Sequence, residues 1–254
     1  MPSPSDYISV VPPTRFATVI FDCDSTLSAV EGIDELAGSQ RDAIAALTEA
    51  AMQGELRLEE VYGQRLDLVR PSREQVAALG RLYVERLVPD ARETIEALRA
   101  EGIGVRIVSG GLLPAVRAVA RAVGVPDDHV AAVDVRFAAD GSYAGWDESS
   151  PLARSFGKRT QLEQWNGTLA HPVMLVGDGV TDLEARPPAD AFVAFAGIVA
   201  REPVLAAADA IVRDRSLAPV LALALGDDPP RSAAARDLLR RASASGPTTI
   251  AADP

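Results

Sequence analysis

The chain has 254 residues and 48% of them are hydrophobic, which is enough for one large α/β domain or for a core with a smaller insert. Its 25 basic and 36 acidic residues give a net charge of −11, which opposes binding to nucleic acid or to an anionic membrane. The single cysteine, Cys23, excludes an internal disulfide, and the first residues lack the features of a secretory signal peptide. We therefore expect a soluble cytoplasmic protein.

An apolar run over residues 16–21 predicts a buried strand, and Asp22 and Asp24 follow its carboxyl end. Parallel α/β sheets bind their ligands at this edge. If the chain stays extended, both carboxylates point the same way and need a cation or hydrogen-bond donors between them. A hard divalent metal such as Mg²⁺ would supply that charge. Taken alone, the pair is explained equally well as a turn or a helix cap.

The next segment, residues 31–87, has the pattern of helices. Apolar residues recur at three- and four-residue spacing over 41–47 and 58–66, and Pro71 with Ser72 begins another helix. From residue 89 the pattern alternates between helix and strand: we predict a helix over 91–100, a strand over 104–108 and a helix over 112–123 that Gly124 ends. Further strands are predicted at 172–176, 191–195 and 210–212. This alternation is typical of a parallel sheet.

One interruption, residues 133–146, predicts a β-hairpin that turns at Asp140 and Gly141. The simplest organisation is then a discontinuous core formed by residues 1–28 and 88–225, with a helical cap over 29–87 placed where it can close over the acidic pair. The remaining tail, 226–254, contains at most one short helix, at 233–242, and we expect its ends to be disordered.

Three more strand or helix ends carry polar residues. Ser109 follows a strand and is expected to open a helix, so its hydroxyl and nearby backbone N–H groups can bind an anion. Lys158 lies at the start of a helix and can offer a cation to a phosphate oxygen. Asp178 and Asp182 follow the strand at 173–176. Each residue has an ordinary explanation as a cap, turn or surface residue. That explanation fails when these three ends and the end that carries Asp22 and Asp24 are considered together.

The ordered set DxDST, SGG, Lys and GDGxTD resembles the four motifs of the haloacid dehalogenase superfamily of phosphotransferases, over residues 16–225. The insert directly after the first motif is similar to the phosphoserine phosphatase branch, as are segments 30–37, 51–54, 141–148 and 187–192. The resemblance implies an α/β fold, with a Rossmann-like parallel sheet core and a helical cap domain inserted after the first strand. It also implies Mg²⁺-dependent hydrolysis of O-phospho-L-serine to L-serine and phosphate, as in serine biosynthesis.

By the same resemblance, Asp22 is the nucleophile that forms an aspartyl-phosphate, and Asp24 is the acid and base. The implied metal ligands are the carboxylates of Asp22 and Asp178 and the backbone carbonyl of Asp24, with Asp182 in support or bound through water. The phosphate oxygens would be held by a further set: Ser109, the Gly110 N–H and Lys158.

The resemblance places substrate choice largely in the insert. Glu31, nine residues after Asp22, corresponds to the acid that holds the substrate ammonium, and Arg65 corresponds to the arginine that holds its carboxylate. Leu58 and Gln53 depart from residues common in the branch, which puts the pocket shape in doubt. The full set implied to lie near the substrate is Glu31, Met52, Arg65, Gly111, Thr181 and Arg201.

Several alternatives stay open at this point. The enzyme could hydrolyse another small phosphate monoester, or it could transfer the phosphoryl group to an alcohol such as homoserine. A non-catalytic binding protein is disfavoured because the motif residues are intact, and a glycosidase is disfavoured because its two acids must flank a sugar. The expected partner is a small phosphate monoester, without nucleic acid or membrane, and a homodimer is left open.

Overall fold

The computed structural model describes residues 14–52, 55–244 and 250–251. Within them the main sheet has seven strands in the order β3-β2-β1-β6-β7-β8-β9, all parallel except β9, which runs antiparallel to β8. The α/β fold with a parallel sheet core is therefore confirmed. The strands are β1 (Thr18–Phe21), β2 (Gly104–Leu112), β3 (Val130–Val133), β6 (Val173–Gly177), β7 (Ala191–Phe195), β8 (Ala210–Val212) and β9 (Ile250–Ala251).

Strand β1 lies near the middle of the sheet, between β2 and β6. Val19 pairs with Val105 on one side and with Met174 on the other, and every residue of β1 and of β6 is buried. Continuous apolar sequence is what a strand covered on both faces requires, which is why these runs were predicted correctly. Because the strands are parallel, their carboxyl ends, including those after Phe21 and Gly177, lie at one edge of the sheet.

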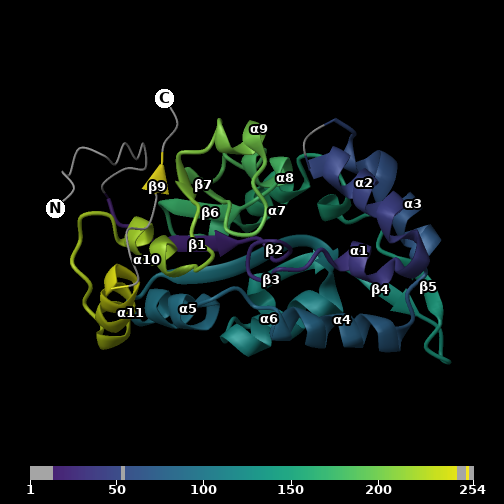
Figure 1. Ribbon diagram of the computed structural model, residues 1–254, viewed down its shortest axis with the longest axis horizontal. Coiled ribbons are helices and arrows are strands. Elements are labelled where there is room, and N and C mark those ends of the chain that lie inside the picture. Colours follow the sequence, from purple (N-terminus) through teal and green to yellow (C-terminus); the bar gives the residue numbers. More distant parts are fainter. Residues whose placement is uncertain (1–13, 53–54, 245–249, 252–254) are drawn as a thin grey trace.

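Helices cover both faces of the sheet: in Figure 1, α5 and α6 lie along one face and α7 and α8 along the other. After residue 88 the described α-helices are α5 (Ala91–Ala100), α6 (Leu113–Val123), α7 (Gly157–Trp165), α8 (Val180–Leu183), α9 (Glu202–Leu205), α10 (Ala218–Leu225) and α11 (Ala233–Ala244). Gly124 ends α6 with a φ of 78°, in the left-handed region that glycine adopts without strain.

Among the described residues, four α-helices follow β1 before the chain returns to the core. They are α1 (Gly32–Leu36), α2 (Arg41–Met52), α3 (Leu58–Val69) and α4 (Arg73–Glu85). Figure 1 shows α1, α2 and α3 together beyond one end of the sheet, while α4 lies in line with α5 and beside α6. The hairpin strands β4 (Val135–Phe137) and β5 (Tyr143–Trp146) pair antiparallel and lie at the same end.

Two local predictions were wrong. Strand β2 continues through Ser109 as far as Leu112, and α6 begins only at Leu113, so Ser109 does not open a helix. Residues 130–133, partly assigned to the hairpin, form β3 instead. Strand β3 pairs with β2 from Ile107 onward, and a register irregularity after Val108 lets Leu112 pair with Val133, an arrangement that local sequence does not encode.

The tail also contacts the core. Helix α11 packs against α5 and α10 and buries Ala235 and Leu238, and the backbone N–H groups of Arg231 and Ser232 donate to Glu101 at the end of α5. Of the tail's ends, for which disorder was expected, residues 245–249 and 252–254 lie outside the described part, while Ile250–Ala251 form β9.

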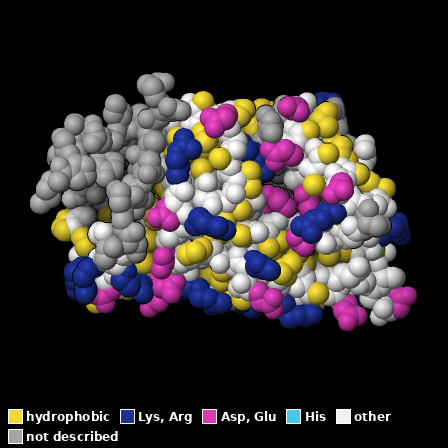
Figure 2. Space-filling view, in the orientation of Figure 1, with side chains coloured by type: hydrophobic (Ala, Val, Ile, Leu, Met, Phe, Trp, Pro, Cys, Tyr) yellow, Lys and Arg dark blue, Asp and Glu magenta, His cyan; other side chains and the backbone are white. Residues whose placement is uncertain are grey.

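On the face drawn in Figure 2, the blue Lys and Arg side chains are interspersed with magenta Asp and Glu side chains. Among the described residues, none of the helices combines the length and the apolar character needed to cross a membrane.

Candidate active site

The first motif leaves β1 in a tight turn. The Asp22 N–H donates to the carbonyl of Val176 on β6, and the carbonyl of Cys23 accepts from the N–H groups of Leu27 and Ser28. This turn places the hydroxyl of Thr26 3.2 Å from Oδ1 of Asp178, on the loop after β6. Adjacent strand ends are thereby joined by buried polar contacts.

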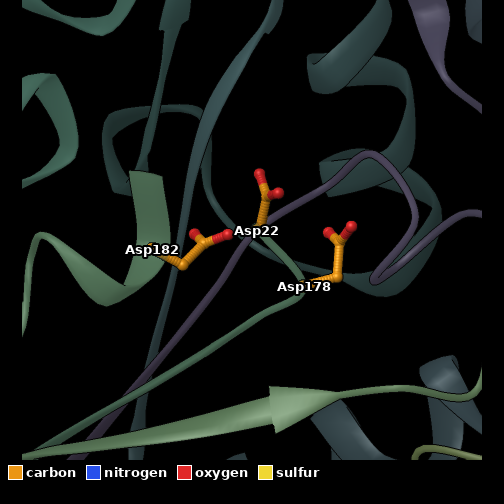
Figure 3. A group of neighbouring side chains, drawn as sticks. All are labelled: Asp22, Asp178 and Asp182. Carbon is orange, nitrogen blue, oxygen red and sulfur yellow. The ribbon is translucent and has the colours of Figure 1, made fainter. Parts of the chain in front are cut away.

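Three carboxylates meet at this edge: Asp22, Asp178 and Asp182 each offer an oxygen, and these atoms lie within 4.8 Å of one another. Figure 3 shows Asp22 between the other two, with the Asp182 carboxylate pointing toward it. All three residues are buried. Oxygen ligands in such a cluster are the donors that a hard divalent cation requires, so these residues fit a metal ion.

Lys158, in the first turn of α7, pairs with two members of this cluster. Its Nζ lies 2.9 Å from Oδ1 of Asp22 and 2.6 Å from Oδ1 of Asp182. The other oxygen of Asp182 accepts from the Gly179 N–H, at 3.1 Å. Burial raises the pKa of Asp22 well above its ordinary value, while the ammonium of Lys158 acts to lower that pKa.

Asp24 has different partners from Asp22. Its Oδ1 accepts from the hydroxyl of Tyr83 at 2.7 Å, and its Oδ2 accepts from the Gly32 N–H at 3.0 Å. Burial raises the pKa of Asp24, and the two donors partly offset that shift. The pKa of Tyr83 is raised above its ordinary value, chiefly by burial, so the phenol keeps its proton.

Asp22 and Asp24 line a cavity, and the end of β2 forms another of its walls. Asp22, Asp24, Ser109, Gly110, Gly111 and Lys158 all line it. The hydroxyl of Ser109 accepts from the Gly111 N–H at 2.9 Å, and the hydroxyl of Tyr62 on α3 donates to the Gly110 carbonyl. Although Ser109 is not at a helix start, it lines the same cavity as Asp22 and Asp24.

Both predicted substrate-selecting residues of the insert, Glu31 and Arg65, line this cavity as well. Glu31 accepts from the hydroxyl of Ser25 at 2.6 Å, and burial, with smaller contributions from Asp178 and other acids, raises its pKa to about 8. Arg65 is buried on α3 and donates to the hydroxyl of Thr48 at 2.6 Å. Its Nε has no hydrogen-bond partner among the described residues.

The remaining predicted residues are placed differently. Thr181 lines the cavity. Arg201 forms a buried ion pair with Asp178 and partly exposed ion pairs, at 3.2 Å and 3.8 Å, with Glu49 and Glu31. Met52 ends α2, and its side chain lies outside the described part of the structure.

Sequence reasoning missed several lining or contacting residues: Ile33, Asp34, Tyr62, Tyr83, Leu152 and Arg154. Most are apolar or aromatic residues in helices, where their spacing indicates only a buried face. Of these, Ile33 and Asp34 fall within a segment, 30–37, that carried the family resemblance.

Comparison with known proteins agrees with this geometry. The sequence matches the haloacid dehalogenase-like hydrolase family over residues 16–190. The chain belongs to the haloacid dehalogenase-like hydrolases. It lies in their phosphoserine phosphatase branch: it is 40% identical over 189 residues to a phosphoserine phosphatase of Bos taurus, covering 73% of this chain and 84% of that protein.

Other members of the family support the same placement. A chloroplastic phosphoserine phosphatase of Arabidopsis thaliana is 40% identical over 200 residues, covering 76% of this chain and 68% of that one. A solved structure of a substrate-bound phosphoserine phosphatase complex superposes with a TM-score of 0.70 and 27% identity, covering 82% of this chain and 97% of that one. A phospho-aspartyl intermediate analogue of a phosphoserine phosphatase gives a TM-score of 0.69 and 26% identity.

Proposed function

We propose that this chain is a Mg²⁺-dependent phosphatase that hydrolyses O-phospho-L-serine to L-serine and phosphate through an aspartyl-phosphate. One observation carries the proposal: the two motif aspartates, the phosphate-binding candidates and the two insert residues line a single cavity. The names of its relatives as phosphoserine phosphatases support the substrate.

In the first step, a carboxylate oxygen of Asp22 attacks phosphorus and the bond from phosphorus to the serine oxygen breaks. Lys158 contacts Asp22 and favours its ionised, nucleophilic form. Asp24, whose pKa burial raises, gives its proton to the departing serine oxygen. Ser109 and the Gly110 N–H hold the phosphoryl oxygens while charge moves.

In the second step, Asp24 is a carboxylate and takes a proton from a water molecule, which attacks the aspartyl-phosphate. The phosphorus–oxygen bond to Asp22 breaks, phosphate leaves, and both aspartates return to their starting states. Asp24 acts first as an acid and then as a base, so it has to exchange a proton easily. Its raised pKa favours that exchange.

We assign the metal site to the carboxylates of Asp22 and Asp178 and the backbone carbonyl of Asp24, with Asp182 in support. When bound, Mg²⁺ supplies positive charge that neutralises the carboxylates and the phosphoryl oxygens. Arg201 contributes a fixed positive charge beside Asp178.

Substrate selection rests on Glu31 and Arg65. The guanidinium of Arg65 suits the substrate carboxylate, and Glu31 suits its ammonium group, whose charge lowers the pKa of Glu31 and keeps it ionised. Met52, Gly111, Thr181 and Arg201 complete the proposed substrate surroundings. We likewise propose the division into a core (1–28 and 88–225), a cap (29–87) and a tail (226–254).

A phosphate-release screen tests the proposal. Phosphoserine, phosphothreonine, phosphohomoserine and sugar phosphates are compared with and without Mg²⁺, and added homoserine tests for phosphoryl transfer. We expect preference for phosphoserine, dependence on Mg²⁺ and release to water. No preference for phosphoserine would refute the substrate, and a phosphorylated acceptor as main product would refute hydrolysis. A cytoplasmic location and a homodimer stay predictions.

A further inference from the structure

The phenol of Tyr83 connects helix α4 to the proposed acid, Asp24. Its hydroxyl donates to Oδ1 of Asp24 at 2.7 Å, while the Gly32 N–H donates to Oδ2 at 3.0 Å. Tyr83 is 0% exposed, so water has little opportunity to replace the phenol. With a donor on each oxygen, rotation of the Asp24 carboxyl is restricted.

The fold leaves a specific space for this phenol. A Cβ at position 32 would lie 2.0 Å from the Tyr83 hydroxyl, so glycine there allows the approach. One turn earlier on α4, a Cβ at Gly80 would lie 3.0 Å from the Cβ of Ala118, which shows how closely α4 packs on α6 (Figure 1). The hydroxyl of Ser28 donates to the Tyr83 carbonyl at 3.0 Å. Gly32 thus leaves room for the hydroxyl of Tyr83, while Ser28 and the packing of α4 on α6 fix the backbone that carries the ring.

We propose that Tyr83 is a positioning residue that orients the Asp24 carboxyl for proton transfer to the leaving oxygen. This inference rests on the proposed function. As the bond from phosphorus to the serine oxygen breaks, that oxygen takes the Asp24 proton and Asp24 becomes a carboxylate. Tyr83 keeps its own proton and donates a hydrogen bond to that carboxylate, and correct orientation before the transfer shortens the path of the proton.

The test is Tyr83→Phe in the full chain, which removes the hydroxyl and keeps the ring. We expect kcat/KM for phosphoserine to fall about 10- to 100-fold, because general acid catalysis needs close alignment. The KM should stay within about threefold, because Glu31 and Arg65 are untouched and binding is separate from proton transfer. For acetyl phosphate, whose acetate leaves without a proton, kcat/KM should change by less than about threefold.

Ser72→Ala is the matched control on the same helix. It removes the capping box of α4 but no contact to Asp24, so it should lower the unfolding temperature while leaving the ratio of the two substrates unchanged. If Tyr83→Phe does not fold, Gly32→Ala pushes the phenol aside instead, and the same selective loss is expected.

Two results would overturn the inference: unchanged phosphoserine turnover in the variant, or an equal fall with both substrates. A failure of the proposed function is distinguishable from these results, because it would appear in the substrate preference of the wild-type protein. If the wild type prefers another alkyl phosphate, the comparison of Tyr83→Phe with wild type is made on that substrate, with the same expected and overturning results.

Discussion

Lys158 Nζ lies 2.9 Å from Oδ1 of Asp22, with only 6% and 8% of the two side chains exposed. Burial lowers the pKa of Lys158, but the carboxylates of Asp182 and Asp22 outweigh it and leave that pKa above its ordinary value. The lysine is therefore charged. It holds the proposed nucleophile in place at a site where burial alone would favour the neutral acid.

Asp22→Asn tests the nucleophile. The amide has nearly the shape of the carboxylate but cannot form an acyl phosphate by the same attack, so we expect turnover to fall below detection. Quenched reactions with labelled phosphoserine should show a phosphorylated protein for the wild type only. Circular dichroism serves as the control for folding, and normal hydrolysis by a folded variant would contradict the assignment.

Gly177→Ala tests the metal site without removing a ligand. A Cβ at this position would lie 2.1 Å from Cγ of Asp182, so the carboxylate has to move. Displacing a group that orients metal ligands typically costs about 10- to 100-fold in metal affinity, which titration of activity or of intrinsic fluorescence with Mg²⁺ would measure.

Gly167→Ala is the matched control for that experiment, because a Cβ there meets no atom within 4 Å. It should leave Mg²⁺ affinity unchanged. If both alanine variants bound Mg²⁺ like the wild type, Asp182 would have no part in the site.

Arg65→Lys tests recognition of the substrate carboxylate. Lysine keeps the charge but loses the planar fork, so KM for phosphoserine should rise by about 10-fold or more. O-phosphoethanolamine has the ammonium but no carboxylate, and its KM should change little. Equal effects on both substrates would indicate that Arg65 supports the pocket through Thr48 rather than binding the carboxylate.

Glu101→Gln tests how Glu101 anchors the tail, through the pH dependence of the free energy of unfolding. Burial acts to raise the pKa of Glu101, but hydrogen bonds from Arg15 and from the Ser232 and Arg231 N–H groups outweigh it and lower the pKa from 4.5 to about 2. A lowered folded-state pKa means that the stabilisation is present above about pH 4.5 and disappears as the pH falls toward 2.

We therefore expect Glu101→Gln to lower the free energy of unfolding by about 1–3 kcal/mol at neutral pH, with the difference shrinking below pH 4.5. Urea denaturation across this range measures it. The control is Asp127→Asn, whose half-exposed side chain lies 3.7 Å from Arg117, and it should change stability by less than about 0.5 kcal/mol. A difference that grows as the pH falls would contradict the prediction.

The sheet and most of its helices were predictable because their signals are local. Apolar runs such as residues 173–176 are buried on both faces, and the helix ends at Ser72 and Gly124 carry a capping box and a left-handed glycine. Strand β9 was not predicted because its pairing with β8 joins residues that are far apart in the chain. The same reason applies to β3.

The candidate site also has a part that the sequence predicts and a part that depends on contacts between distant residues. Sequence alone determined which residues carry charge or a hydroxyl at the strand and helix ends, because parallel strands and the helices that follow them bring those ends to one edge whatever the details of packing. That was sufficient to select Asp22, Asp24, Ser109, Lys158 and Asp178. It also gave Glu31 and Arg65, through the resemblance of the insert.

Only the tertiary structure decided which side chain contacts which. Tyr83 reaches Asp24 because α4 packs closely on α6 and Gly32 leaves room, and Arg201 pairs with Asp178 across two loops. Nothing in the local pattern distinguishes Tyr83 from an ordinary core residue. Such contacts depend on distances between elements far apart in sequence, and these are set by the packing of the whole core rather than by local sequence.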